Sequence, residues 1–271
     1  MLLANKVAIV TGSAKGIGKA IALKFAEEGC KVAVVDIATY EGEGVAEEIR
    51  SKGQEAIFVK CDVTRADQVS NMVNYVLSKF GKIDILVNNA GGVSVARTSG
   101  IEQSEEDWDK LINLNLKSVF LCCRAVVPHM IPRRYGKIIN ISSMGCVSPP
   151  GSNPGYHAAK AGVIGLTFDL ATALAPFNIN VNAILPGPIR TAFWDPMLQL
   201  VKDSERFLSD VGRLMTPLRR CGMPEEVAGA ALFLASDLSS YITGALIPVS
   251  GGIPLPVISL RDILKEHGLH S

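Results

Sequence analysis

Tyr156 and Lys160 stand four residues apart in the run GYHAAKAG, and Ser143 precedes the tyrosine by thirteen residues. A tyrosine ordinarily ionises near pH ~10, which is too high for a base at neutral pH. On a helix, positions i and i+4 share one face, so this spacing places the Lys160 ammonium beside the Tyr156 phenol. A cation about 4 Å away, at an effective dielectric of ~20, contributes about 4 kcal/mol, which corresponds to about three pKa units.

Such a pair is a candidate general base that takes the proton from an alcohol, with the Ser143 hydroxyl holding the substrate oxygen. The same spacing also occurs on ordinary helix surfaces, where the two side chains are only solvated neighbours. The elements that surround these residues therefore decide between chemistry and a surface pair.

The bulk composition argues against several classes of function. The chain has 271 residues, of which 48% are hydrophobic, and its net charge is +1. This charge favours neither nucleic acid nor a membrane surface as a partner, and no uninterrupted apolar run reaches the ~18 residues of a membrane span. The N-terminal run MLLANKVAIV has the pattern of a strand and not of a signal peptide, so we expect a cytoplasmic protein. The six cysteines and four histidines show no metal-ligand spacing, so we expect reduced thiols and no metal.

Short β-branched runs alternate with longer helical patterns along most of the chain. The expected strands are 7–10, 32–35, 56–59, 85–87, 137–141, 180–184 and 245–249. The expected helices include 17–28, 45–52, 66–80, 105–130, 155–174 and 224–235. Strands that are apolar on both faces are typical of a parallel sheet covered by helices. The pattern predicts an α/β fold with a single Rossmann-type, doubly wound parallel sheet and helices on both of its faces.

A single dinucleotide-binding and catalytic domain over residues 1–252 is the economical division, because no linker rich in Pro, Gly or Ser interrupts the alternation. Residues 187–223 are long and mixed in character, which is typical of a functional segment such as a substrate lid. Residues 253–271 form a C-terminal tail, whose amphipathic piece 260–267 is a candidate contact with a neighbouring subunit.

The first expected strand runs into the glycine-rich loop 11–18, TGSAKGIG. Glycines allow backbone to approach a pyrophosphate closely, and the helix that follows directs its N-terminal amides at that anion. The spacing G-x-x-x-G-x-G is longer than in the G-x-G-x-x-G fingerprint, but its place between the first strand and the first helix favours a dinucleotide site over a plain turn. Asp36 ends the second strand, where a carboxylate binds ribose hydroxyls and repels a 2′-phosphate. Asp36 therefore favours NAD over NADP, whereas Lys15 in the loop argues for the phosphate.

Over about residues 5–252, the chain resembles the short-chain dehydrogenase/reductase family. The motifs that carry the resemblance stand in order: TGSAKGIG, CDVT (61–64), NNAG (88–91), Asn115 in NLNLKSVF, ISSMG (141–145), YHAAK (156–160) and PGPIRT (186–191). Two positions depart from the family pattern: Ala159 stands where serine is frequent, and Ser250 stands where aspartate is frequent.

The resemblance implies the catalytic set Asn115, Ser143, Tyr156 and Lys160, with Ser142 as the alternative to Ser143. Tyr156 would be the acid/base, and Lys160 would hold the nicotinamide ribose and lower the tyrosine pKa. Asn115 would bend its helix and hold a water that links Lys160 to solvent.

The resemblance also implies a set of cofactor contacts. Asp62 and the Val63 amide would bind the adenine. Asn89 and Gly91 would line the adenosine ribose side and brace the fourth strand. Ile189 and Thr191 would contact the nicotinamide carboxamide. The expected cofactor-binding residues are Gly12, Ser13, Gly16, Ile17, Gly18, Asp36, Asp62, Val63, Asn89, Gly91, Tyr156, Lys160, Ile189 and Thr191.

The expected reaction is an NAD-dependent interconversion of a secondary alcohol and a ketone. The alternatives are a 3-oxoacyl-carrier-protein reductase, a family member that usually prefers NADPH, and a regulator that binds NAD without turnover. Expected partners are the small-molecule substrate and further copies of the chain, since the family usually forms tetramers; neither nucleic acid nor a membrane is expected.

We expect the substrate pocket to be built from residues 92–98, 144–153 and the segment after Pro186, and side chains of these segments give two further expectations. An apolar, roomy cleft would be built from Phe193, Trp194, Met197, Leu198 and Phe207, although plain packing of the lid explains these residues equally well. Candidate receivers of a carboxylate or phosphate are Arg97, Arg190 and Arg206.

Overall fold

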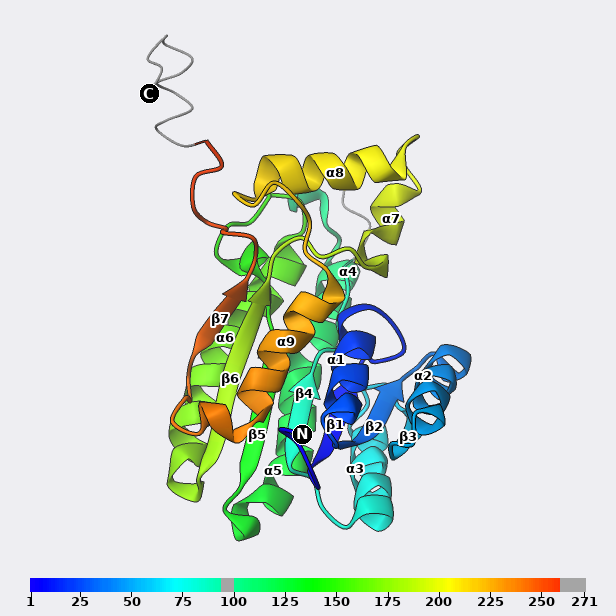
Figure 1. Ribbon diagram of the computed structural model, residues 1–271. Helices are drawn as coiled ribbons and strands as arrows, with labels where there is room; N and C mark the ends of the chain where they lie inside the picture. The colour runs from blue at the N-terminus through cyan, green and yellow to red at the C-terminus, as the bar shows by residue number, and fades with distance from the viewer. Residues whose placement is uncertain (94–99, 259–271) are drawn as a thin grey trace, which may run out of the picture.

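The computed structural model describes residues 1–93 and 100–258. Its described strands form one sheet in the order β3-β2-β1-β4-β5-β6-β7, and every neighbouring pair is parallel. The strands are β1 (Val7–Thr11), β2 (Lys31–Asp36), β3 (Ala56–Lys60), β4 (Ile85–Asn88), β5 (Gly136–Ile141), β6 (Ile179–Pro186) and β7 (Leu246–Val249). Helices cover both faces of this sheet (Figure 1), so the predicted doubly wound fold is confirmed.

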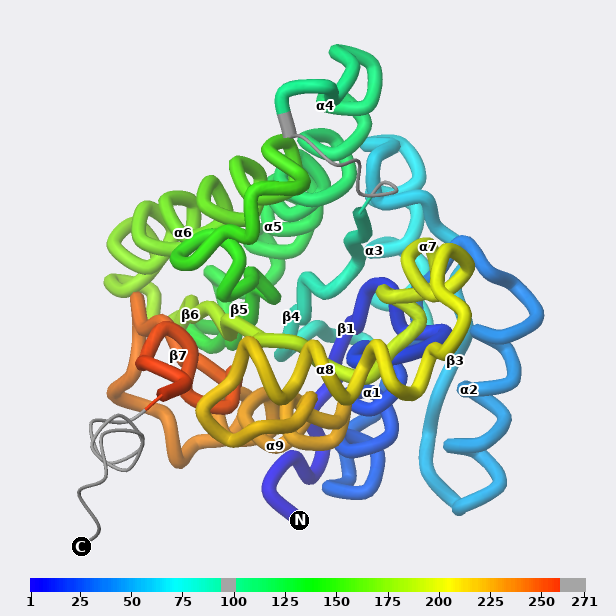
Figure 2. The backbone as a smooth tube through the Cα atoms, turned by 90° about the horizontal axis from the view of Figure 1, so that it is seen from above, coloured from blue at the N-terminus to red at the C-terminus, as the bar shows by residue number. Residues whose placement is uncertain are grey.

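The helices follow the strands in the expected alternation. Their bounds are α1 (Gly16–Glu27), α2 (Thr39–Ser51), α3 (Ala66–Phe80), α4 (Glu105–Ile112), α5 (Ser118–Met130), α6 (Pro154–Leu174), α7 (Asp195–Leu198), α8 (Ser204–Met215) and α9 (Pro224–Ala235). Helix α2 begins at Thr39, six residues before the predicted start, because the stretch 39–44 has two glycines and no aliphatic side chain to show the helical period. Helices α7 and α8 lie across the end of the sheet (Figures 1 and 2), within the segment 187–223 expected as a lid.

The core has one layer on each side of the sheet, and β1 shows why. Side chains alternate along a strand, so Ala8 and Val10 join the cluster under α1, α2 and α9, whereas Val7 and Ile9 join the cluster under α3, α5 and α6. All four side chains are fully buried. Both faces of the strand are therefore apolar, as the sequence pattern indicated.

A π-helical turn, Asn113–Lys117, joins α4 to α5 inside the single helix that the sequence predicted over 105–130. The Asn115 side chain donates to the carbonyls of Leu111 (3.1 Å) and Gly92 (2.9 Å), so the turn is fixed to the loop after β4. Single π turns inside α-helices occur frequently at functional sites.

Two helical stretches, Glu105–Arg133 and Pro154–Phe177, are long and apolar enough to cross a membrane. Both lie in the layer that covers one face of the sheet, and Val126 and Val163 of these stretches are fully buried in its core. A core helix passes the same test of length and hydropathy, so packing against the sheet explains their composition.

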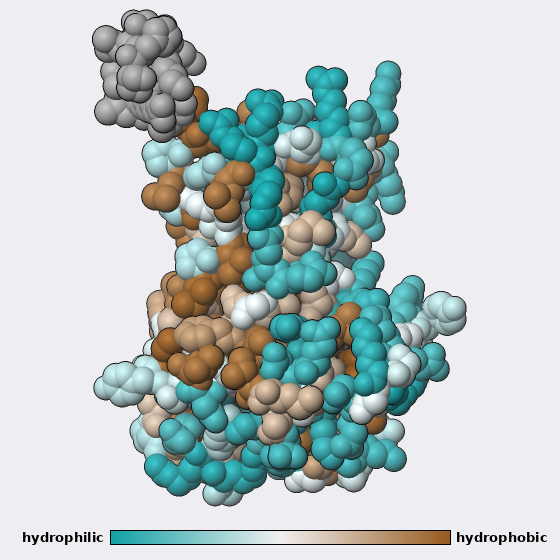
Figure 3. All heavy atoms as spheres, viewed as in Figure 1, coloured by the Kyte–Doolittle hydropathy of each residue, from teal (hydrophilic) through white to brown (hydrophobic). Residues whose placement is uncertain are grey.

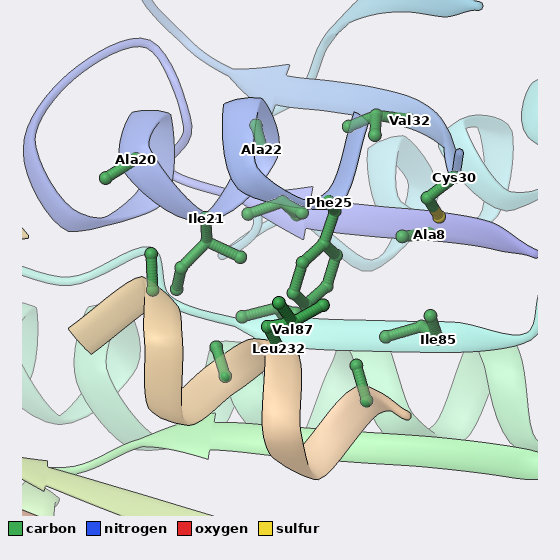
Figure 4. Packing of buried hydrophobic residues seen from close by; sticks show 14 of the residues in the cluster. Ala8, Ala20, Ile21, Ala22, Phe25, Cys30, Val32, Ile85, Val87 and Leu232 are labelled. Atoms are coloured by element: carbon green, nitrogen blue, oxygen red, sulfur yellow. The ribbon is translucent and has the colours of Figure 1, made fainter. Parts of the chain in front are cut away.

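Phe25 on α1 lies at the centre of the first core layer. Its ring points between α1 and α9 toward Val87 and Leu232 (Figure 4), and no part of it is exposed. This contact fastens the helix that carries the glycine-rich loop to the rest of the sheet.

We expect Phe25→Ala to lower the free energy of unfolding by about 3–5 kcal/mol, because the substitution removes a buried ring and leaves a cavity. Urea denaturation followed by circular dichroism measures the change. Tyr40→Ala is the matched control, since Tyr40 is 90% exposed on α2 and should shift the free energy by no more than about 0.5 kcal/mol. Equal losses in the two variants would contradict this account of the core.

Candidate active site

A cavity of ≈ 630 Å³ opens where the carboxyl ends of the strands meet the lid. It receives residues from the loops after β1, β2, β3, β4, β5 and β6. From β1, the strands β2 and β3 extend the sheet in one direction, and β4 to β7 extend it in the other. The strand order therefore reverses between β1 and β4. In open α/β sheets ligands bind at such a reversal point.

The glycine-rich loop forms the floor of one half of this cavity. Gly12 has a φ of +62°, and a β-carbon there would lie 2.7 Å from the Ala90 Cα, so only glycine fits. Gly16 also has a positive φ and, with Ile17, lines the cavity at the start of α1. Gly18 is a packing residue instead, because a β-carbon there would lie 2.2 Å from the Gly12 carbonyl oxygen.

Ser13, expected as a cofactor contact, is fully buried beneath the loop and is absent from the cavity lining. Its hydroxyl donates to the Val10 carbonyl at 2.7 Å and accepts from the Val35 amide at 2.9 Å. These bonds occupy the side chain, so its hydroxyl holds the loop to β2. The sequence could not separate this role from ligand contact.

Asn89 lines the cavity and supports the loop from the β4 side. Its amide donates to the carbonyls of Thr11 and Gly12, both at 2.9 Å. These bonds agree with the expected bracing role beside β4.

Asp36 lies at the end of β2 with its carboxylate held in place. One oxygen accepts from the Ala14 amide at 2.9 Å, and the other accepts from the Ala38 amide at 3.0 Å. Asp36, which favours NAD, and Lys15, which favours the 2′-phosphate of NADP, both line the cavity.

Asp62 and Val63 line the cavity beyond β3. One carboxylate oxygen of Asp62 accepts from the Thr64 amide and hydroxyl at 2.9 and 2.7 Å. This local turn fixes the carboxylate, and the Asp62 amide donates to the Gln68 side chain at 2.8 Å.

Ser143 and Tyr156 meet across the cavity, although they come from different elements. Ser143 follows β5, Tyr156 is in the first turn of α6, and both line the cavity, where the Ser143 hydroxyl acts on the pKa of the Tyr156 phenol as a hydrogen-bonding neighbour. Ser142 is committed elsewhere, because its hydroxyl donates to the Lys160 carbonyl at 2.8 Å. The geometry therefore favours Ser143 over Ser142 as the serine beside the tyrosine.

Lys160 lies one turn after Tyr156, and its ammonium is 5.7 Å from the centroid of the tyrosine ring. The ammonium donates to the Ile141 carbonyl at 2.8 Å. Burial lowers the pKa of Lys160 to about 8. At neutral pH the lysine remains largely protonated.

The expectation that Lys160 lowers the tyrosine pKa does not hold for the protein alone. Burial raises the pKa of Tyr156 to about 12, while the hydrogen bond with Ser143 acts in the opposite direction. The physical reason is that both side chains are at least nine-tenths buried, which disfavours the phenolate as well as the ammonium.

Gly91 lies between Asn115 and Lys160. A β-carbon on this glycine would be 2.6 Å from Asn115 Oδ1 and 3.2 Å from Lys160 Nζ. Asn115 is fully buried, and its Oδ1 accepts from the Gly92 amide at 3.1 Å. Its bonds keep the loop beside Lys160 in place, and the expected link through a water stays a prediction.

The lid completes the second half of the cavity. Ile189 and Thr191 both line it; the Ile189 carbonyl accepts from the Trp194 indole at 2.9 Å. The Phe193 ring lies 5.8 Å from the Tyr156 ring and 5.6 Å from the Trp194 ring, so Phe193 packs beside the candidate acid/base and Trp194 packs against Phe193.

Some of the residues that were expected to line the substrate cleft lie outside the cavity. Phe193, Trp194 and Met197 line the cavity, whereas Leu198 and Phe207 do not. Arg190 is paired with Glu205, Arg206 lies near Asp210 on α8, and neither arginine is in the lining. Arg97 lies outside the described residues, as does the tail piece 260–267.

Sequence reasoning missed several residues of the lining, among them Leu114, His157 and Ile253, whereas Asn153 and Met215 lie in segments that were expected there. His157 follows the candidate acid/base directly, so its position was a usable signal. Ile253 follows the last strand, and only the folding of the chain brings it to the cavity. Among residues 1–93 and 100–258, no group of His, Cys, Asp or Glu side chains is arranged to hold a metal ion.

The family described as enoyl-(acyl carrier protein) reductase matches residues 12–254. A 3-oxoacyl-acyl-carrier-protein reductase of Thermotoga maritima is 44% identical over 93% of this chain and 99% of its own length. Subunit BbsD of a hydroxy(phenyl)methyl-succinyl-CoA dehydrogenase of Thauera aromatica is 40% identical over 93% of this chain and 98% of its own.

A crystal structure of a short-chain type dehydrogenase/reductase from Mycobacterium marinum superimposes with a TM-score of 0.86 at 37% identity. The superposition covers 94% of this chain and 97% of that one. The span 12–254 matched by the family contains Gly12, Ser143, Tyr156 and Lys160. The chain belongs to the short-chain dehydrogenase/reductase family, and it is an oxidoreductase of the kind that binds a nicotinamide cofactor.

Proposed function

We propose that this protein interconverts a ketone and a secondary alcohol carried on an acyl thioester, with NAD(H) as the preferred cofactor. The observation that carries the proposal is that Ser143, Tyr156 and Lys160 converge in one wall of the cavity whose other half is formed by the glycine-rich loop and Asp36. A protein that only binds the nucleotide has no need for Ser143, Tyr156 and Lys160 together, which argues against the non-catalytic regulator.

We favour an acyl thioester over a simple alcohol as the substrate because of the names of the two relatives. The names of both relatives describe acyl thioesters that carry a keto or hydroxyl oxygen. The comparisons therefore support the 3-oxoacyl-carrier-protein reductase alternative better than an alcohol dehydrogenase of free alcohols. A keto group on an acyl chain is reduced to a secondary alcohol, so the chemistry required of the site is unchanged.

The cavity fits a nicotinamide dinucleotide. Its floor requires glycine at Gly12, where a β-carbon would fill the space beside Ala90, and the start of α1 directs backbone amides at the same place. Asp36 would hold the adenosine ribose, Asp62 and Val63 the adenine, and Ile189 and Thr191 the nicotinamide end. When bound, the cofactor supplies or accepts the hydride.

The residues of the chain would handle the substrate oxygen and its proton. Ser143 and Tyr156 would both donate hydrogen bonds to the ketone oxygen and hold it beside the buried wall. A phenol with a pKa of about 12 is protonated at neutral pH, so Tyr156 stands ready to give its proton to the oxygen as it becomes a hydroxyl. Lys160, protonated at the same pH, would stabilise the tyrosinate that remains.

Asp36 is the basis for the cofactor preference. Its carboxylate is fixed by two backbone amides and lines the cavity at the end of β2. A fixed negative charge repels the 2′-phosphate of NADP(H) and accepts hydrogen bonds from the ribose of NAD(H). The usual NADPH preference of the carrier-protein reductases conflicts with this residue, and the conflict makes the preference testable.

A homo-oligomer remains part of the proposal. Hydrophobic residues gather on the face where α9 and β7 lie (Figure 3), and Phe233 and Leu238 are exposed there. Phe120 on α5 and Phe168 on α6 are also 46% exposed. Large exposed apolar patches mark contact surfaces, which favours assembly with further copies.

We expect Tyr156→Phe to lower kcat with acetoacetyl-CoA and NADH by about 100- to 10,000-fold, because the proton donor is lost. Oxidation of NADH at 340 nm measures the rate, and quenching of tryptophan fluorescence measures NADH binding, which should be retained. Tyr241→Phe is the control, because Tyr241 is fully exposed and absent from the cavity lining. Undiminished turnover in Tyr156→Phe would remove the proposed acid/base.

We expect the Tyr156 phenol of the free protein to keep its proton when an ordinary tyrosine has lost it, because burial raises the pKa of Tyr156 to about 12. The difference in tyrosinate absorbance between the natural chain and Tyr156→Phe isolates this group during a titration to alkaline pH, with circular dichroism to confirm that the fold persists. A tyrosinate signal near neutral pH would show that Lys160 controls the ionisation even without cofactor.

We expect Asp36→Ala to reduce the preference for NADH over NADPH, measured as the ratio of kcat/KM values, by at least about tenfold. Removal of about 1.4 kcal/mol of repulsion is sufficient for this change. Lys15→Ala should change the ratio in the opposite direction, since Lys15 is the cation in the same wall. Asp67→Ala, on the exposed side of α3, serves as the control. An unchanged ratio in Asp36→Ala would show that another group sets the preference for NADH over NADPH.

A further inference from the structure

The end of the lid is joined to the segment that follows β7. We name this junction, residues 215–219 together with 250–257, the lid–tail seam. The Leu218 amide donates to the Gly251 carbonyl at 3.0 Å, and the Arg219 guanidinium donates to the Val257 carbonyl at 2.8 Å. Two bonds from neighbouring residues therefore hold the two segments side by side.

The two glycines of the seam allow this close packing. A β-carbon on Gly251 would lie 3.1 Å from Thr216 Cβ, and one on Gly252 would lie 2.8 Å from Pro217 Cγ. Thr216 is buried, and its hydroxyl bonds the Gly212 carbonyl at 2.9 Å within the lid. The seam is thus tied to α8 on one side and to β7 on the other.

The seam presents two apolar side chains, Met215 and Ile253, to the cavity. The Ile253 backbone is held by Ser250, whose hydroxyl donates to the Ile253 carbonyl at 3.1 Å. The Ile253 side chain also packs against the small cluster of Met144, Ala183 and Leu185 at the ends of β5 and β6. Ile253 therefore forms a supported wall, with protein core behind it and the cavity in front.

The rest of this half of the cavity is uncharged. The lining there includes Met144, Phe193, Trp194 and Met197, while the charged residues of the lining, namely Lys15, Asp36, Asp62 and Lys160, belong to the cofactor half or to the reacting centre. An apolar wall between an aromatic lid and a methionine favours an apolar group of limited size.

We propose that Ile253 is a specificity-determining residue that limits the size of the apolar group attached to the reacting carbon of the substrate. Ser250 and Arg219 are positioning residues that keep Ile253 in the wall. This inference rests on the proposed function, because it concerns the substrate of the same site. It names the substrate class as 3-oxoacyl thioesters with a short apolar chain.

Ile253→Ala and Ile253→Phe test the wall in opposite directions. The substrates are a series of 3-oxoacyl-CoA thioesters from acetoacetyl-CoA to 3-oxodecanoyl-CoA, with NADH. We expect Ile253→Ala to raise the ratio of kcat/KM for long over short chains by about tenfold or more, and Ile253→Phe to lower it by a similar factor, since each methylene in such a pocket changes discrimination by about 10-fold or more. The matched control is Leu255→Ala, which lies in the same segment, is 66% exposed and is absent from the lining.

Ser250→Ala and Arg219→Met test the support of the wall. Each variant should raise KM for acetoacetyl-CoA severalfold and weaken the preference between chain lengths, while kcat changes less than twofold. Ser250→Thr keeps the hydroxyl and should restore the natural preference. Melting temperature and NADH binding, measured for every variant, identify any loss that comes from unfolding.

The outcomes separate the inference from the function it rests on. If the natural chain reduces the thioesters but both Ile253 variants change all chain lengths by the same factor, the inference is overturned and the proposed function stands. If the natural chain reduces no member of the series, the proposed function fails and the inference fails with it.

Discussion

The structure depends on one set of hydrogen bonds at the point where strand order reverses. The Thr11 hydroxyl at the end of β1 donates to the Val87 carbonyl and accepts from the amides of Asn89 and Ala90, while the Asn89 side chain returns two bonds to the β1 end. These bonds hold the carboxyl ends of β1 and β4 at a constant separation. The glycine-rich loop leaves on one side and the loop toward Asn115 leaves on the other, so both halves of the cavity start from this junction.

Burial decides the resting state of the reactive groups. Isolated from the fold, an ammonium one helical turn from a phenol favours the phenolate. In the folded chain both groups are withdrawn from water, so the pKa of the phenol rises and that of the ammonium falls. The result is a protonated tyrosine beside a largely protonated lysine at neutral pH, which suits donation of a proton to a ketone. These protonation states favour reduction of a ketone, in which Tyr156 donates a proton. They favour it over the general-base role that the spacing of Tyr156 and Lys160 suggests.

The two halves of the cavity are selective for different reasons. In the cofactor half, the backbone of the glycine-rich loop selects a ligand by close approach, and the Asp36 carboxylate selects it by charge. In the substrate half, aromatic and aliphatic side chains act through shape, because the charged side chains that line the cavity lie elsewhere. The lid–tail seam makes this second half dependent on residues from two distant parts of the sequence, and a change of substrate requires changes in both.

The sequence by itself determined the fold class, the positions of the strands and the order of the motifs, because each depends on local periodicity and local turn chemistry. Asp36, Tyr156 and Lys160 were identifiable for the same reason, since a strand end and a helical spacing are local. The tertiary structure alone decided that Ser13 faces the core, that Leu198 and Phe207 miss the cavity, and that Met215 and Ile253 reach it. It also decided the pKa of Tyr156. Burial and contact between distant segments are properties of packing, and no pattern within one segment encodes which other segment will cover it.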